Sequence, residues 1–208
     1  QPKASVFINS WNSPSYDNAC VHGFIDGNDG TVYQTLPWNH RGWHCGSGSK
    51  GSGNNTHIGV EMCEPACIRY TSGSNFTCSD LSTAKAVAKR TYDAAVELFA
   101  MLCKQYNLNP TADGVIVSHR EGHSRGIASN HGDPEHLWNG LGMGYTMDGF
   151  RKAVKAAMGG STAGGGSSSG SGGSGISGFP AVPFTVKVLI PDLNYRSAPS
   201  MSGSVKGQ

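Results

Sequence analysis

Polar residues able to do chemistry gather in three parts of this sequence: residues 38–46, Glu61, and residues 118–136. In the third part, His119 ends an apolar run and Asp133 follows in a polar stretch. A histidine fixed by a strand and a carboxylate brought by a loop provide nitrogen and oxygen ligands of the kind that bind zinc. A catalytic zinc also needs a nearby carboxylate to accept a proton, and Glu61 is a candidate. The pattern indicates a hydrolytic metal site.

Each of these residues also has an ordinary structural interpretation. His119 alone could be a hydrogen-bonded histidine at a strand end, Glu61 a solvated side chain, and Asp133 a turn former before Pro134. The combination favours a site, because the chain carries eight histidines and several of them lie near tryptophans. The spacing by itself leaves both interpretations open.

Strands are predicted to position these groups. Residues 21–25 and 31–36 are apolar runs around an Asp-Gly turn, which predicts a β-hairpin. Residues 58–62 alternate, so that three apolar side chains share one face and Glu61 lies on the other. Residues 115–119 are apolar on both faces until His119, which predicts an interior strand.

Two helices complete the expected domain. Apolar residues recur at helical spacing from 81 to 106, with Ser79 or Asp80 as a cap, and a second helix is predicted over 147–158. The fold class is therefore α/β, with a mixed central β-sheet flanked by helices, plus an incomplete β tail.

Composition divides the chain into three parts. Residues 159–178 are nearly all Gly and Ser and predict a linker between a body, residues 1–158, and a tail, residues 179–208. The net charge of +2 gives no basic face for nucleic acid, and no apolar run is long enough to cross a bilayer. The six cysteines are expected to be reduced structural thiols rather than metal ligands, because Cys63 and Cys67 lack a second matching pair.

From about residue 20 to residue 158 the sequence resembles the second class of N-acetylmuramoyl-L-alanine amidases, which includes phage endolysins, autolysins and relatives of peptidoglycan recognition proteins. Ordered motifs carry the resemblance: His-Gly-Phe-Ile at 22–25, Asp-Gly-Thr-Val-Tyr-Gln at 29–34, Arg-Gly-Trp-His-Cys-Gly at 41–46, Ile-Gly-Val-Glu at 58–61, Val-Ser-His-Arg-Glu at 117–121 and Asp-Pro at 133–134. Each motif is weak alone, and their order is specific.

The resemblance implies a role for each matching residue. His119 and Asp133 correspond to two zinc ligands, and Glu61 to the general base. His131 matches a position where many members have a lysine that stabilises the oxyanion, and histidine is a departure because it is only partly charged near neutrality. Trp43 and His44 correspond to residues that contact substrate.

One expected zinc ligand has no match. In the family it lies on an initial strand, and residues 1–16 contain no histidine, so we expect the chain to begin after that strand. The gap from His119 to Asp133 is also longer than usual. His123, which restores the shorter spacing, and His22 are reserve ligands.

The tail resembles the start of a bacterial SH3-like wall-binding domain, through Leu-Asn-Tyr-Arg-Ser at 193–197 before Pro199. The chain ends at residue 208, too early for that barrel to close, so we expect a truncated domain.

The resemblance implies a monomeric zinc enzyme that hydrolyses the amide between N-acetylmuramic acid and L-alanine in peptidoglycan, without nucleic acid or membrane insertion. It would act at the bacterial cell wall, as a phage endolysin released from the host cytoplasm or as a secreted autolysin. One alternative is a non-catalytic peptidoglycan-binding module, because one ligand is missing and the fragment itself could be inactive. A zinc D-alanyl carboxypeptidase is disfavoured, because position 126 is Gly where that family needs Asp.

Overall fold

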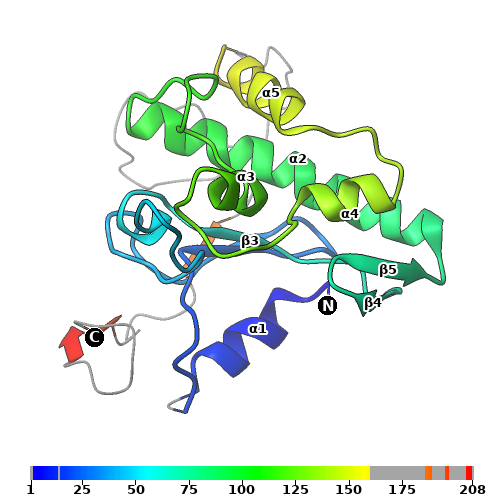
Figure 1. Ribbon diagram of the computed structural model, residues 1–208, viewed down its shortest axis with the longest axis horizontal. Helices are drawn as coiled ribbons and strands as arrows, with labels where there is room; N and C mark the ends of the chain where they lie inside the picture. Colours follow the sequence, from blue (N-terminus) through cyan, green and yellow to red (C-terminus); the bar gives the residue numbers. More distant parts are fainter. Residues whose placement is uncertain (1, 14, 160–185, 189–194, 197–204, 208) are drawn as a thin grey trace, which may run out of the picture.

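The computed structural model describes residues 2–13, 15–159, 186–188, 195–196 and 205–207. Its centre is a small mixed sheet with strand order β3-β1-β2-β6. The strands are β1 (Gly23–Ile25), β2 (Val32–Gln34), β3 (Val60–Met62) and β6 (Val186–Val188). β1 pairs antiparallel with β2 and parallel with β3, and β6 pairs parallel with β2. The predicted mixed α/β fold is confirmed (Figure 1).

The β1–β2 hairpin forms where the Asp-Gly turn predicted it. The Asp26 carboxylate accepts a hydrogen bond from the Asn28 amide at 2.8 Å, and the Gly30 amide donates to the Asp26 carbonyl at 2.9 Å. Gly30 has φ of 77°, a conformation that glycine adopts without steric cost. The register pairs Phe24 with Tyr33, which fixes the two faces of β1.

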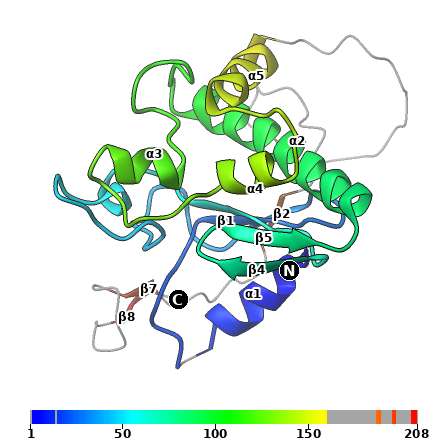
Figure 2. The same cartoon turned by 45° about the vertical axis from the view of Figure 1, so that its right-hand side comes forward.

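Helices α2 (Leu81–Gln105) and α5 (Met147–Gly159) confirm the two predicted helices and pack against each other beside the sheet (Figure 2). Asp80 caps α2 by accepting from the Thr83 amide at 3.0 Å. Ile25, Leu98 and Val154 are fully buried in the core that these helices form with the sheet. Burying side chains of this size stabilises the fold by roughly 1.5–3 kcal/mol each.

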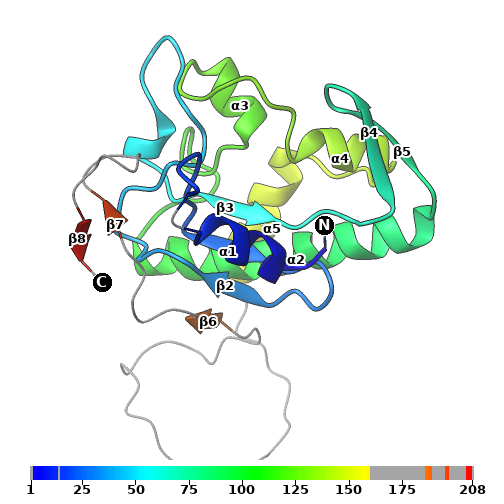
Figure 3. The same cartoon turned by 90° about the horizontal axis from the view of Figure 1, so that it is seen from below.

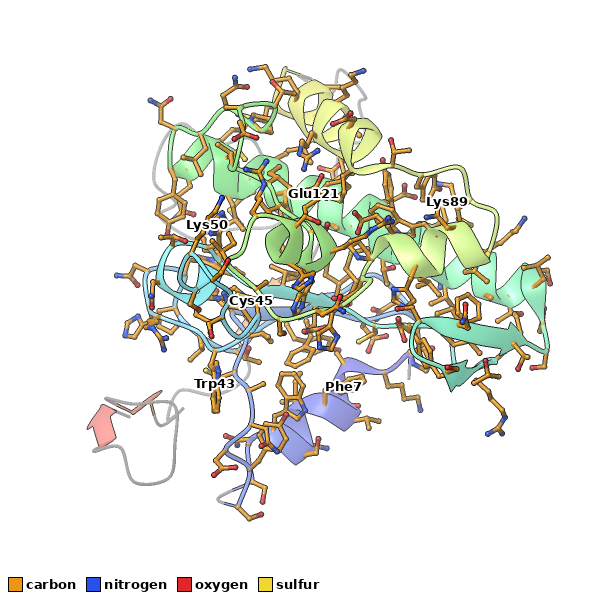
Figure 4. All side chains as sticks on the ribbon, in the orientation of Figure 1. Phe7, Trp43, Cys45, Lys50, Lys89 and Glu121 are labelled. Atoms are coloured by element: carbon orange, nitrogen blue, oxygen red, sulfur yellow. The ribbon has the colours of Figure 1, made fainter. Side chains whose placement is uncertain are left out.

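Helix α1 (Ala4–Trp11) covers the opposite face of the sheet, as Figure 3 shows from below. Phe24 of β1 stacks on Phe7 at 5.8 Å between ring centroids and meets Trp11 edge-on at 5.1 Å. Phe7 rises from α1 towards the sheet in Figure 4. Because Ile25 enters the α2–α5 core and Phe24 enters this aromatic cluster, β1 is buried on both faces.

Shorter elements surround the sheet. They are the 3-10 helix η1 (Gly53–Asn55), the hairpin β4 (Ile68–Ser72) and β5 (Asn75–Cys78), α3 (His119–Ser124), α4 (Glu135–Gly140), and the two-stranded sheet of β7 (Tyr195–Arg196) and β8 (Val205–Gly207). The β4–β5 hairpin packs beside α4, with Phe76 against the backbone at Gly140.

The predicted strand over 115–119 is wrong: residues 115–118 form a turn and an irregular segment, and His119 is the first residue of α3. The predicted linker, 159–178, lies outside the described residues except for Gly159, which ends α5. Within the described residues, no helix has the length and apolar character needed to span a membrane.

Candidate metal centre

His119 is positioned by the start of helix α3. The Ser118 hydroxyl accepts from the Glu121 amide at 3.0 Å, and the Glu121 carboxylate accepts from the Ser118 amide at 3.2 Å. These reciprocal bonds form a capping box, which satisfies two backbone donors at the helix start. The His119 backbone is therefore held firmly even though it does not lie on a strand.

Neighbouring helices hold α3 from two sides. Arg151 of α5 forms an ion pair with Glu121, on the side of α3 that faces α5 in Figure 4. The same guanidinium donates to the Ile116 carbonyl at 3.0 Å, which fixes the segment leading into α3. The Ser118 hydroxyl also donates to the Glu135 carboxylate at 2.9 Å and so ties α3 to α4.

His119, His131 and Asp133 form a group whose potential ligand atoms all lie within 4.8 Å of one another. His119 Nδ1 is 3.7 Å from Asp133 Oδ2, and His131 Nδ1 is 3.8 Å from Asp133 Oδ1. Two ligands on one tetrahedral zinc lie about 3.3 Å apart, so these separations are close to those of a formed site. The sequence predicted two members of this group as ligands, and the structure adds His131.

The electrostatics of His119 suit a ligand. Burial lowers the pKa of His119 and outweighs the opposite effect of the nearby Asp133 carboxylate, which favours the neutral imidazole that metals require. Its Nε2 lies 3.1 Å from the Ser129 hydroxyl, which in turn donates to the Cys45 carbonyl at 3.2 Å. This chain of contacts orients the ring and leaves Nδ1 facing Asp133.

Glu61 lines the same cavity as the three-residue group, from the middle of β3. Val60 and Met62 pack on the main core, so the predicted alternation that turns Glu61 away from the core is confirmed. Burial, together with the charges of Asp133 and Glu64, raises the pKa of Glu61 to about 7. A carboxyl group with such a pKa can accept and release a proton near neutral pH.

Trp43 and His44 lie in the wall of this cavity. The Asn54 side chain accepts hydrogen bonds from the amides of His44 at 2.8 Å and Cys45 at 2.9 Å, which shapes the loop. Burial lowers the pKa of His44 to about 4, and its ring lies against Gly59, where a side chain would clash. Both residues are partly buried, and Figure 4 shows the Trp43 side chain projecting from its loop on the side away from α3.

Sequence reasoning missed a second polar cluster, formed by Glu64, Tyr70 and His136. The Tyr70 hydroxyl donates to Glu64 Oε1 at 2.7 Å and lies 2.6 Å from His136 Nε2, which itself is 3.5 Å from Glu64 Oε1. The signal available in the sequence was position: Glu64 follows strand β3 by two residues, and His136 comes three residues after Asp133.

Charges in this cluster favour an ion pair. Burial opposes the charge on both groups, but hydrogen bonds from His136 and Tyr70 lower the pKa of Glu64, and the bond to Glu64 raises the pKa of His136. The His136 amide donates to the Gly132 carbonyl at 2.9 Å, next to Asp133. We call the side of the cavity formed by β4, β5 and the cluster of Glu64, Tyr70 and His136 the hairpin wall. The side formed by α3 together with His119, His131 and Asp133 is called the α3 wall.

The two reserve ligands lie outside the three-residue group. Both ring nitrogens of His22 are engaged by backbone: Nε2 is 2.8 Å from the His40 carbonyl, and Nδ1 accepts from the Gly59 amide at 2.9 Å. His22 is buried and connects the loop before η1 to β3. His123 Nδ1 lies 3.3 Å from the Ala128 carbonyl.

The cavity between the walls has a volume of about 1130 Å³ and extends along β3. Its lining includes the site and also apolar residues on both sides of the strand, among them Trp11, Val115 and Val117. In the described part of the chain, β3 is one of the two edge strands of the sheet, and β6 is the other. Residues 4–11, where the sequence lacked the family's first ligand, form helix α1.

The sequence profile of the N-acetylmuramoyl-L-alanine amidase family matches residues 3–136, which cover strands β1 to β3, both walls and the whole candidate site. The chain belongs to this family. The expected relationship to this family is thereby confirmed.

Three relatives from Bacillus show how far the similarity extends. The amidase CwlH of Bacillus subtilis (strain 168) is 50% identical over 38 residues, 18% of this chain and 15% of that protein. XlyA of the same strain is 55% identical over 38 residues, covering 18% of this chain and 12% of that protein. CwlA of Bacillus sp is 28% identical over 82 residues, covering 39% of this chain and 31% of that protein. The chain thus aligns with less than a third of the length of each of these relatives.

Proposed function

We propose that this chain uses zinc to hydrolyse the amide between the lactyl group of N-acetylmuramic acid and the L-alanine of the peptidoglycan stem peptide. The observation that carries the proposal is the convergence of His119, His131 and Asp133 in a cavity that Glu61 also lines. The family relationship and the names of the relatives, all N-acetylmuramoyl-L-alanine amidases, support the same reaction.

The three-residue group fits zinc. Two imidazoles and one carboxylate are a ligand set of the catalytic type, which leaves a fourth position open. In this proposal His119, His131 and Asp133 hold the metal. Zinc supplies Lewis acidity there, which acidifies water and polarises a carbonyl oxygen.

Glu61 acts as the proton carrier in the proposed reaction. As the oxygen of water adds to the amide carbon, the Glu61 carboxylate accepts the proton that leaves that water. Glu61 then donates this proton to the alanine nitrogen, and the carbon–nitrogen bond breaks. The products are a lactyl carboxyl group on the sugar and a free L-alanine amine on the stem peptide.

The binding-only alternative rests on one observation, namely that the family's first ligand has no match in residues 1–16. Against it stand the retained Glu61 and the complete three-residue group. We also propose that residues 1–158 form the catalytic domain and that the tail contributes to wall binding.

The test is digestion of purified Gram-positive cell walls by the full chain with added zinc, followed by mass spectrometry of the products. We expect stem peptides with a new free L-alanine amine, lost on chelation and regained with zinc. Binding to the walls without any new amine would overturn the enzymatic proposal and favour the binding module. Release of D-alanine alone would favour a carboxypeptidase.

His131 needs a separate experiment, because the resemblance implies oxyanion stabilisation whereas the geometry favours a ligand. For His131→Ala, a ligand role predicts a loss of zinc affinity of 10-fold or more. Oxyanion stabilisation predicts unchanged zinc affinity and a fall in kcat of about 10²–10³-fold. Zinc titration with a competing chelator, alongside kcat, separates the two roles.

A further inference from the structure

Cys67 and Cys78 lie near each other at the base of the β4–β5 hairpin. Ile68 pairs with Cys78 in the ladder, and the Ser79 amide donates to the Cys67 carbonyl at 3.0 Å, so Cys67 is offset from Cys78 by one residue. Strand spacing and rise place the two Cα atoms about 6 Å apart. That separation lies within the range of about 4.4–6.8 Å that disulfides span.

The two cysteine side chains lie against the same apolar surface. Cys67 and Cys78 are partly buried and pack against one apolar cluster, formed by Ala84, Ala88, Leu137 and Leu141. The two thiols lie close enough to interact electrostatically, and Cys67 Sγ lies 3.3 Å from the Asp80 carbonyl. Neighbouring residues 66, 77, 79 and 80 are exposed, so a small oxidant has access to the pair.

Two other cysteines are placed differently. Cys63 and Cys103 are buried in separate clusters, Cys63 under helix α1 and Cys103 within the α2–α5 core. Such positions suit the structural thiols that the sequence predicted for all six cysteines. Cys67 and Cys78 therefore call for a different interpretation.

We propose that Cys67 and Cys78 are a modification site that forms an intramolecular disulfide, with a small-molecule disulfide as the oxidant. One protein thiolate attacks the small disulfide, forms a mixed disulfide and releases one small thiol. The second protein thiolate attacks the mixed disulfide and releases the other small thiolate. The two protons lost by the protein thiols are balanced by the two that the released thiolates take up. The protein thiols are oxidised to one S–S bond, and the small disulfide is reduced to two thiols.

This bond would close the hairpin into a ring next to the N-cap of α2. Because β4 carries Tyr70 to Glu64 and His136, the ring would restrain the hairpin wall of the cavity. A cross-link of this kind acts mainly by reducing the freedom of the opened segment. Local opening of the hairpin is thus the property that oxidation should change.

The experiment treats the full chain with oxidised glutathione at pH 8, blocks the remaining thiols and maps the peptides without reduction. We expect a mass loss of two hydrogens and a linked pair of peptides containing Cys67 and Cys78. Trypsin cleavage after the exposed Arg69, scored after quenching and reduction, should slow by about 5-fold or more on oxidation. Incubation of the oxidised protein with dithiothreitol before the trypsin step should restore the original rate of cleavage after Arg69.

The Cys67→Ser, Cys78→Ser double variant should show no protection by glutathione, and a Cys20→Ser, Cys45→Ser double variant should behave like the wild type. Links between other cysteines, or only mixed disulfides with glutathione, would overturn the proposal. A 67–78 link that leaves cleavage at Arg69 unchanged would overturn the restraint of the hairpin.

Discussion

The α3 wall and the hairpin wall meet the same cavity but are held in different ways. The α3 wall is fixed by a capping box, by Arg151 from α5 and by the Ser118–Glu135 bond. The β4–β5 hairpin contacts the body through an apolar cluster shared with α2 and α4 and through the Tyr70 hydroxyl. The proposed ligand His119 lies on the wall with the denser polar network, which suggests that the chemistry needs fixed geometry while the hairpin needs only to shape the cavity.

Replacing a proposed ligand on the α3 wall should have the largest effect. His119→Ala is expected to lower zinc affinity by at least 10-fold and amidase activity by at least about 10³-fold. The measurements are zinc titration and wall digestion at saturating zinc. His123→Ala is the matched control, because His123 is on the same helix but outside the three-residue group. If both variants lose activity equally, the placement of the metal on the α3 wall is wrong.

Glu61→Gln should leave zinc affinity unchanged and lower kcat by about 10²–10⁴-fold, because the amide cannot accept a proton. The same change should stabilise the zinc-free protein at pH 8. The pKa of Glu61 is about 7 in the folded protein and about 4.5 when unfolded, so the wild type loses stability as pH rises between those values.

Thermal unfolding of zinc-free samples at pH 8 and pH 4.5 measures this second effect. The gain from Glu61→Gln should be present at pH 8 and absent at pH 4.5. A variant that is less stable than the wild type at pH 8 would show that Glu61 is held by interactions that the charge needs.

Arg151→Met tests whether the α3 wall depends on its support from α5. The change leaves the partly buried Glu121 carboxylate and the Ile116 carbonyl without this donor, so we expect a loss of about 2–3 kcal/mol in the free energy of unfolding. Urea unfolding measures it. Lys152→Met, on the exposed part of the same helix, should change stability by less than about 0.5 kcal/mol.

His136→Gln addresses the hairpin wall and should have the smallest effect, about 1 kcal/mol, with pH dependence as its signature. The pKa of His136 is raised in the folded protein, so its stabilisation is present below the usual value of 6.5 and is lost as pH rises through the higher folded value. Glu64 has a lowered pKa, so its contribution is lost as pH falls below 4.5.

Unfolding measured at pH 5.5 and pH 9 should therefore show a larger difference between the wild type and His136→Gln at pH 5.5. Tyr70→Phe keeps the ring packing but removes the bridging hydroxyl, and it should remove part of the same difference. Equal effects of His136→Gln at both pH values would contradict the ion pair.

Local sequence patterns predicted the elements that are determined by residues close together in the sequence. The Asp-Gly turn gave the β1–β2 hairpin, Asp80 and helical spacing gave α2, and alternation gave the orientation of Glu61. The strand ending at His119 failed, because a short apolar run is equally compatible with a buried irregular segment. Ser118 and Glu121 form a Ser-x-x-Glu capping box, which was a readable signal for a helix start at this point.

Other parts of the site depend on contacts that a sequence does not display. His131 approaches His119, with ring centroids 4.5 Å apart, because the loop after α3 folds back, and nothing in the local pattern encodes that return. Tyr70 meets His136 across 66 positions of sequence. The roles of His119 and Asp133 came from the resemblance, and the structure adds only that they lie close together.

Backbone hydrogen bonds join two loops beside the candidate metal centre. The Gly53 amide donates to the Ile127 carbonyl at 2.7 Å, and the Lys50 amide donates to the Gly126 carbonyl at 2.7 Å. Gly48 lies so close to Gly126 that a methyl group on it would meet backbone atoms at 2.5 Å. Although both segments are largely irregular, these amides should exchange with deuterium as slowly as those of a helix. Lack of regular secondary structure therefore does not make this part of the molecule pliable.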